Sequence, residues 1–227
     1  MRWTGALALL LAAACTGREA AAPPAPTTTS TSTTTGATTT TRPTSSTAPP
    51  RRTTTTAAAV AGTYRFPVAA ASARYGHSHH DYPATDIFAP CGSQVVAAAA
   101  GVVQEVSRSD TWDPKVNDGA TRGGLFTSVI GDDGVRYYGS HLSAVAPGID
   151  AGVRVSAGQP LGSVGDTGDA RGVGCHLHFG LSPNCGPGDW AVRRGAVYPW
   201  PYLDSWRAGG QRSPAPAVAA WNAAHPC

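Results

Sequence analysis

Lysine is almost absent from this chain of 227 residues: Lys115 is the only one, and just 14% of all residues are charged. The 17 basic residues exceed the 14 acidic ones, but five arginines precede residue 62, with one glutamate. The rest of the chain therefore holds 12 basic and 13 acidic residues. A domain that binds nucleic acid is expected to cluster lysine and arginine on its folded part. The charge distribution therefore argues against a nucleic-acid partner.

Motifs of several other protein classes are also missing. No CxxC pair occurs, which disfavours a thiolate zinc site or a thiol redox site. No G-x-S-x-G occurs, the motif expected around the nucleophile of many serine hydrolases. Lipoyl and biotinyl carriers need a modified lysine in a tight hairpin, and Lys115 lies outside the stretch 153–168 that has their pattern.

The first 15 residues, MRWTGALALLLAAAC, have the layout of an export signal. An early arginine precedes an apolar run at 6–11, which is too short to span a bilayer, and small residues follow it. Cys15 ends this stretch as the lipidated cysteine of a bacterial lipobox does, although Ala12 stands where leucine is usual. We predict an exported chain, either anchored to the outer face of the cytoplasmic membrane through a lipidated Cys15 or secreted after ordinary signal cleavage.

Residues 16–61 are predicted to be a disordered linker. Within 27–56, 17 of 30 positions are threonine and four are serine, and no large apolar residue occurs. Such a segment cannot bury enough apolar surface to offset the entropy lost on ordering. Residues 62–227 are therefore the predicted folded domain, with a C-terminal extension from about residue 186.

The folded domain is predicted to be mostly β, as an antiparallel sheet or barrel-like sandwich, because short apolar runs alternate with turn signals. The expected strands are 85–88, 94–96, 101–106, 126–130, 135–139, 159–164 and 176–181. Gly-Asp-Asp-Gly at 131–134 predicts a hairpin. Residues 217–224 are the best helix candidate. The polar loop 107–124 is expected to line a groove. The aromatic stretches 189–190 and 200–206 are expected to cover the sheet, with an extra glycan- or peptide-contacting surface as the alternative.

The histidines carry the strongest chemical signal. His176 and His178 lie two positions apart in an expected strand, so both imidazoles project from one face. A second cluster, at 76–86, contains three histidines and ends in Asp86. A catalytic zinc ion takes three nitrogen or oxygen ligands and keeps a position open for water. Two histidines and one aspartate fit that pattern.

Three segments together resemble the motif blocks of the lysostaphin/LytM-type zinc peptidases: 86–92 (DIFAPCG), 138–142 (YGSHL) and 174–179 (GCHLHF). Residues 158–168 (GQPLGSVGDTG) resemble the turn that precedes the HLH strand of that family. The blocks follow the family order and span about residues 75–182. The resemblance implies a fold like the duplicated hybrid motif, one zinc ion per chain, and a peptidoglycan peptide crosslink or stem as the substrate.

The resemblance also implies the roles of individual residues. His178 is expected to bind zinc together with Asp86 and one upstream histidine, while His141 and His176 are expected to be catalytic residues that do not bind the metal. One of these two would take a proton from a zinc-activated water and the other would stabilise the oxyanion. The sequence leaves open which does which. An inactive wall-binding module that activates other hydrolases is the alternative function.

The upstream zinc ligand is the one departure from the family pattern. The family usually has histidine four residues before the aspartate, where this sequence has Tyr82. His80 lies six positions before Asp86, and this even spacing would point both side chains to one face of a continued strand. We therefore predict His80 as the ligand, with His79 as the alternative.

The four cysteines after residue 62 predict two disulfides, for which three connectivities exist. The implied zinc site invites antiparallel pairing of the Asp86 strand with the His178 strand, which would bring Cys91 near Cys175. This favours the pairs Cys91–Cys175 and Cys185–Cys227. A local loop closed by Cys175 and Cys185 is the alternative.

Overall fold

A computed structural model describes residues 63–227. The predicted export signal at 1–15, the Cys15 lipidation site and nearly all of the linker lie outside the described residues. No helix within 63–227 is both long enough and apolar enough to cross a membrane.

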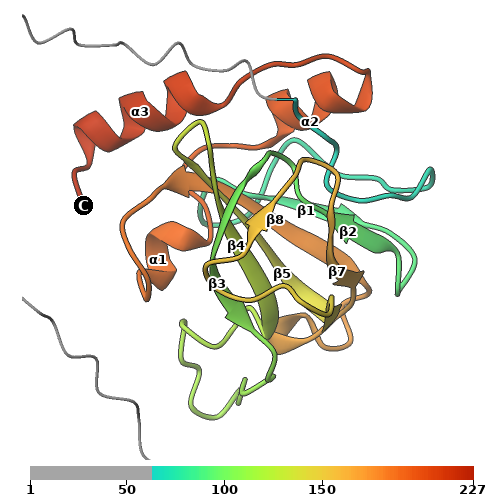
Figure 1. The fold of residues 1–227 in the computed structure, drawn as a ribbon. Coiled ribbons are helices and arrows are strands. Elements are labelled where there is room, and N and C mark those ends of the chain that lie inside the picture. The colour runs from blue at the N-terminus through green and yellow to red at the C-terminus, as the bar shows by residue number, and fades with distance from the viewer. Residues whose placement is uncertain (1–62) are drawn as a thin grey trace, which may run out of the picture. The chain divides into compact units, whose positions relative to one another are not determined.

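The body of the domain is an antiparallel sheet of eight strands (Figure 1). The strands are β1 (Thr85–Phe88), β2 (Gln94–Val96), β3 (Gly101–Ser107), β4 (Leu125–Gly131), β5 (Val135–Val145), β6 (Arg154–Val155), β7 (Pro160–Val164) and β8 (His176–Pro183). The helices are the 3-10 turn η1 (Gly168–Ala170), α1 (Trp190–Arg193), α2 (Trp200–Arg207) and α3 (Ala215–Ala224). Neighbouring strands follow the order β1-β8-β5-β4-β3-β6, while β7 pairs with both β2 and β5.

The sheet confirms the predicted antiparallel, mostly β fold. All seven expected strands form, and Gly131 to Gly134 connect β4 to β5 as a hairpin. Strand β5 runs to Val145 instead of ending at Gly139, because it changes partners: Val135–Ser140 pair with β8, and Leu142–Val145 pair with β7. The two-residue β6 and the helices α1 and α2 were not expected.

The two faces of β8 have different roles. Leu177, Phe179 and Leu181 are buried in the hydrophobic core, whereas His176 and His178 alternate with them and project from the opposite face. The aromatic C-terminal segment covers the core, as predicted. Trp206 of α2 stacks on Tyr64 with ring centroids 5.3 Å apart, and α2 and α3 lie at one end of the sheet (Figure 1).

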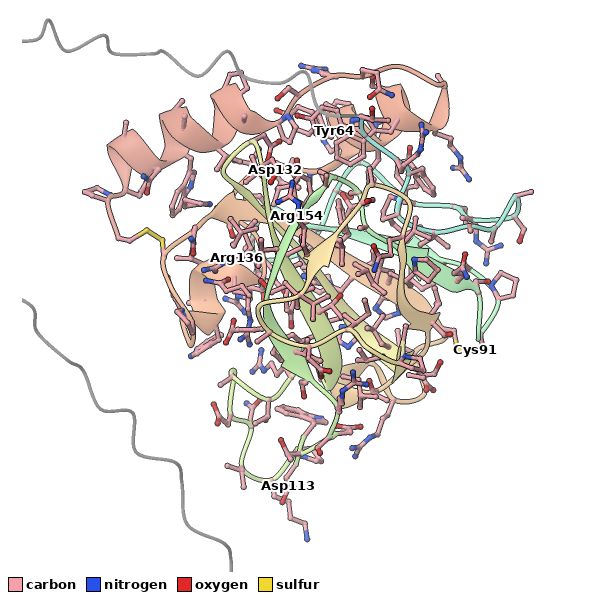
Figure 2. All side chains as sticks on the ribbon, viewed as in Figure 1. Tyr64, Cys91, Asp113, Asp132, Arg136 and Arg154 are labelled. Atoms are coloured by element: carbon pink, nitrogen blue, oxygen red, sulfur yellow. A yellow bond between two sulfur atoms is a disulfide. The ribbon has the colours of Figure 1, made fainter. Side chains whose placement is uncertain are left out.

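Both favoured disulfides are present, Cys91–Cys175 and Cys185–Cys227. The first joins the segment after β1 to the residue before β8, on an edge of the molecule where Figure 2 labels Cys91. The second ties the loop after β8 to the C-terminal residue. The local pair Cys175–Cys185 is therefore wrong.

Removing the first disulfide is expected to destabilise the domain. Cys91 and Cys175 are 84 residues apart, so the bond closes a long loop and restricts the unfolded chain. Replacing both residues by serine should lower the free energy of unfolding by about 2–5 kcal/mol, measured by urea denaturation. An unfolding midpoint equal to that of the wild type would contradict this account.

Candidate metal centre

Three neighbouring strands bring Asp86 and His178 together. In the β1–β8 ladder Asp86 lies opposite His178, and in the β5–β8 ladder Ser140 lies opposite the same histidine. The His178 ring nitrogen Nδ1 is 2.9 Å from Oδ1 of Asp86. The predicted pairing of these strands is therefore confirmed, with the two side chains directly across from each other.

His79 joins this pair from the loop that precedes β1. Its Nε2 atom lies 3.7 Å from Oδ2 of Asp86, and its side chain is only 2% exposed. Potential ligand atoms of His79, Asp86 and His178 all lie within 4.8 Å of one another. These three residues are the one group of this kind within residues 63–227.

The structure places His79 in this group, whereas the predicted ligand His80 lies outside it and His79 was the alternative. Strand β1 begins at Thr85, and residues 80–83 form a series of bends. The alternation of side chains in a strand therefore does not extend back from Asp86 to the histidines. The six positions between His80 and Asp86 do not determine to which side the His80 ring points. His80 is exposed and lies beside the His79 ring, with the centroids 4.1 Å apart.

Hydrogen bonds to the main chain fix the orientation of both ligand candidates. His178 donates Nε2–H to the Arg194 carbonyl oxygen at 2.9 Å, and His79 donates Nδ1–H to the Tyr82 carbonyl oxygen at 3.0 Å. A carbonyl only accepts, so these nitrogens carry the protons, and the other nitrogen of each ring faces Asp86. Such bonds are the usual outer contacts of metal-binding histidines.

The donor set fits a zinc ion. The Nδ1 atom of His178 and Oδ1 of Asp86 are both acceptors when the ring is neutral, so their approach requires either a proton or a cation between them. Two imidazole nitrogens and one carboxylate are ligands of the kind that catalytic zinc takes. Three protein ligands leave a coordination position for water or substrate.

The charges of the group favour cation binding. Burial tends to raise the pKa of Asp86, but a His178 ring that carries a proton on Nδ1 as well outweighs burial, through its hydrogen bond and its charge, and lowers this pKa to about 2. A metal cation at this position would take the place of that proton. Burial and the neighbouring His178 lower the pKa of His79. At neutral pH the aspartate is therefore ionised and His79 is neutral, which are the forms that bind metals.

The two predicted catalytic histidines lie beside the group. The ring centroid of His141 is 4.9 Å from that of His176 and 5.9 Å from that of His178. His141 has a positive φ of 63°, at the point where β5 leaves β8 and joins β7. A histidine in this sparsely populated conformation, held by the change of strand partner, is typical of a functional position.

His141 and His176 are oriented in the same way. Each donates Nδ1–H to a main-chain carbonyl at 2.8 Å, that of Thr167 for His141 and that of Gly174 for His176. Their Nε2 atoms therefore carry the free lone pairs. Burial, together with the charges of His178 and His176, lowers the pKa of His141 to about 3, so its ring is neutral at pH 7.

A groove with a cavity of about 80 Å³ is lined by His141 and His178, while His79, Asp86 and His176 lie behind its surface. The loop between β3 and β4 contributes Gly119, Arg122 and Gly123, which confirms that the polar loop lines a groove. Figure 2 labels Asp113 in this loop, which projects from the sheet. Sequence reasoning missed Arg193 and Arg194, which also line the groove. Trp190 lines it as well, in the segment for which a glycan- or peptide-contacting surface was the alternative.

Gly180 allows the Arg194 main chain to lie on β8. A Cβ atom at Gly180 would overlap the Arg194 carbonyl oxygen, which is the acceptor of the His178 ring. Gly180→Ala should therefore displace this carbonyl, lower the free energy of unfolding by about 1–3 kcal/mol and weaken zinc binding.

Urea denaturation and zinc titration would measure both effects. Gly76→Ala is the matched control, because a Cβ there meets other atoms no closer than 3.9 Å. Equal zinc affinity in Gly180→Ala and Gly76→Ala would show that the Arg194 carbonyl does not support the site.

Comparison with known proteins gives consistent matches. The model of Peptidase family M23 matches residues 80–190. The L-Ala–D-Glu endopeptidase of Bacillus subtilis (strain 168) is 31% identical over 127 residues, which cover 54% of this chain and 34% of the relative. The chain thus matches only about a third of that relative's length.

Similar folds occur among solved structures. The catalytic domain of the antimicrobial peptidase lysostaphin from Staphylococcus simulans is 27% identical, with 59% of this chain and 93% of that chain covered and a TM-score of 0.45. A zinc-containing peptidase from Vibrio cholerae is 20% identical, with 60% of this chain and 38% of that chain covered and a TM-score of 0.42.

Proposed function

We propose that this chain, which belongs to peptidase family M23 through residues 80–190, is a zinc-dependent endopeptidase. It would cleave peptide bonds in peptidoglycan stems or crosslinks. The observation that carries the proposal is the group formed by His79, Asp86 and His178, with His141 and His176 beside it. The matched relative is itself an endopeptidase for an L-Ala–D-Glu bond, which supports a peptidoglycan substrate.

His79, Asp86 and His178 would hold the metal. Zinc bound there would polarise the scissile carbonyl and lower the pKa of a water molecule toward ~7. His141 and His176 both present a free Nε2 atom while Nδ1–H is bound to the main chain. Each ring can therefore accept a proton at Nε2 and later donate it from the same atom to the leaving amine or to a developing oxyanion.

The inactive wall-binding alternative has less support. A module that only binds does not need five oriented histidine and aspartate side chains in one cluster. Four imidazoles of this chain each donate one N–H to a main-chain carbonyl and leave the other nitrogen without a proton. This arrangement is the preorganisation that catalysis requires.

The export of the chain is also part of the proposal, because peptidoglycan lies outside the cytoplasmic membrane. It is supported by the signal-like residues 1–15 and by the two disulfides, which persist in oxidising compartments. The mass of the mature chain would distinguish a lipidated Cys15 from ordinary signal cleavage.

Digestion of purified peptidoglycan tests the proposed activity. The wild type should release new amino termini and soluble muropeptides, which mass spectrometry can assign to a bond, whereas His178→Ala should release neither. Activation of another wall hydrolase without any bond cleavage by the chain itself would contradict the endopeptidase proposal and favour the binding module.

A further inference from the structure

Arg194 stands out among the side chains that line the groove. Within residues 63–227, its guanidinium forms no ion pair and no hydrogen bond, and its Nε atom is buried without a partner. The main chain of the same residue is fixed, because its carbonyl accepts the His178 ring proton at 2.9 Å. An unpaired cation is therefore positioned directly beside the metal-binding group.

Two aromatic rings hold the guanidinium in place. Its central carbon lies 3.9 Å from the ring centroid of Tyr82 and 5.0 Å from that of Trp190. Stacking of this kind restrains the planar group but leaves its N–H donors free at the edge. Tyr82 occupies the position where the family pattern has histidine. The ring on which the Arg194 guanidinium stacks is therefore the residue at which this sequence departs from that pattern.

The two other arginines of the groove differ from Arg194. Arg193 is paired with Glu105 at 3.1 Å and stacks on Phe126. Arg122 donates to the Asn117 side chain at 2.6 Å. All three arginines have a buried Nε atom without a partner, so the difference lies in their terminal N–H groups: those of Arg193 meet a carboxylate and one of Arg122 meets an amide, whereas those of Arg194 meet no polar group within the described residues.

The carboxylates of the groove do not neutralise Arg194 either. Burial raises the pKa of Asp169 although the charge of Arg122 opposes this, and its Oδ1 atom lies 3.9 Å from Nε2 of His141. Neither Asp169 nor Asp81 forms an ion pair with an arginine within the described residues. The free donors of Arg194 therefore remain available to a ligand.

We propose that Arg194 forms a carboxylate-binding subsite, so that the chain selects peptides with an acidic group on a residue next to the scissile bond. The inference rests on the proposed peptidase function and names the substrate class of that same site. A guanidinium matches a carboxylate with two parallel N–H···O bonds, and charge-assisted bonds in a partly buried site are stronger than neutral ones. A carboxamide in the same place would leave the arginine charge uncompensated.

The test uses two stem peptides that differ only in the glutamate carboxylate, which is free in one and a carboxamide in the other. The wild type should cleave the acidic peptide with a kcat/KM about 10- to 100-fold higher. Arg194→Gln should reduce this ratio to about one. Arg194→Lys should keep an intermediate ratio, because the charge remains but the planar fork is lost.

Arg154→Gln is the matched control for the loss of one positive charge. Arg154 pairs with Asp132 on the surface, away from the groove, and the two side chains lie close together in Figure 2. This variant should keep the wild-type ratio. Equal cleavage of both peptides by the wild type, or loss of the preference in Arg122→Gln but not in Arg194→Gln, would overturn the subsite.

Binding of the same two peptides to the His141→Ala chain separates this inference from the proposed function. Tighter binding of the acidic peptide, lost when Arg194→Gln is added, would support the subsite even if the wild type cleaved neither peptide. Cleavage of both peptides without discrimination would support the peptidase and overturn the subsite.

Discussion

Replacing His79 by alanine is expected to abolish tight zinc binding, whereas His80→Ala should retain one zinc ion per chain. His79 presents its Nε2 atom to Asp86 from a side chain that is 2% exposed, while His80 is exposed. Loss of an outer-shell partner already costs 10- to 100-fold in metal affinity, so loss of a ligand should cost at least about 100-fold. Competition with a chromophoric chelator measures this affinity.

The neighbouring histidines make these variants matched controls for each other. Both remove one imidazole from the same loop, but the His79 ring is buried and bound to the Tyr82 carbonyl whereas His80 is exposed, so the stability of both variants has to be measured as well. Urea denaturation of both variants would show that the metal-free domain remains folded. Zinc loss in His80→Ala with retention in His79→Ala would contradict the assignment.

Replacing His141 by alanine is expected to lower kcat by about 10²- to 10⁴-fold while one zinc ion stays bound. The ring is neutral at pH 7, and its Nε2 atom is free because Nδ1–H is bound to the Thr167 carbonyl. Removing the His141 ring takes away a group that exchanges a proton with the reacting atoms, but it does not remove a ligand of the metal. Single-turnover cleavage of a stem peptide and zinc analysis of the same sample measure the two effects.

His225→Ala is the control for this variant. His225 is exposed, follows α3 and stacks on Trp221, with centroids 4.6 Å apart. It should keep wild-type kcat. Full activity of His141→Ala would exclude a catalytic role for this residue, and loss of zinc would show that it supports the metal instead.

The strands around the site were predictable because their signals are local. The alternation in residues 176–181 places two histidines on one face, and this face is the one that bears Asp86 in the neighbouring strand. The disulfide Cys91–Cys175 followed from the same pairing. The alternation is a local property of the sequence, whereas the pairing of the two strands came from the zinc site that the family resemblance implies.

The structure differs from the sequence-based expectations where the chain leaves regular structure. The choice of His80 assumed a strand that would continue back from Asp86, but the chain bends at 80–83, and a spacing has no fixed direction there. Arg194 carries no motif, and it reaches the groove because the segment after α1 crosses β8 at Gly180. Such contacts depend on long-range packing that no local pattern encodes.

Zinc titration of the metal-free chain, followed by the rate at which it releases new amino termini from peptidoglycan, tests the central claim most directly. The account predicts no release before zinc is added, a rate that rises to a plateau at one equivalent per chain, and no recovery in His178→Ala. Release that is unaffected by removing the metal, or a folded chain that binds one zinc ion without cleaving peptidoglycan, would contradict it.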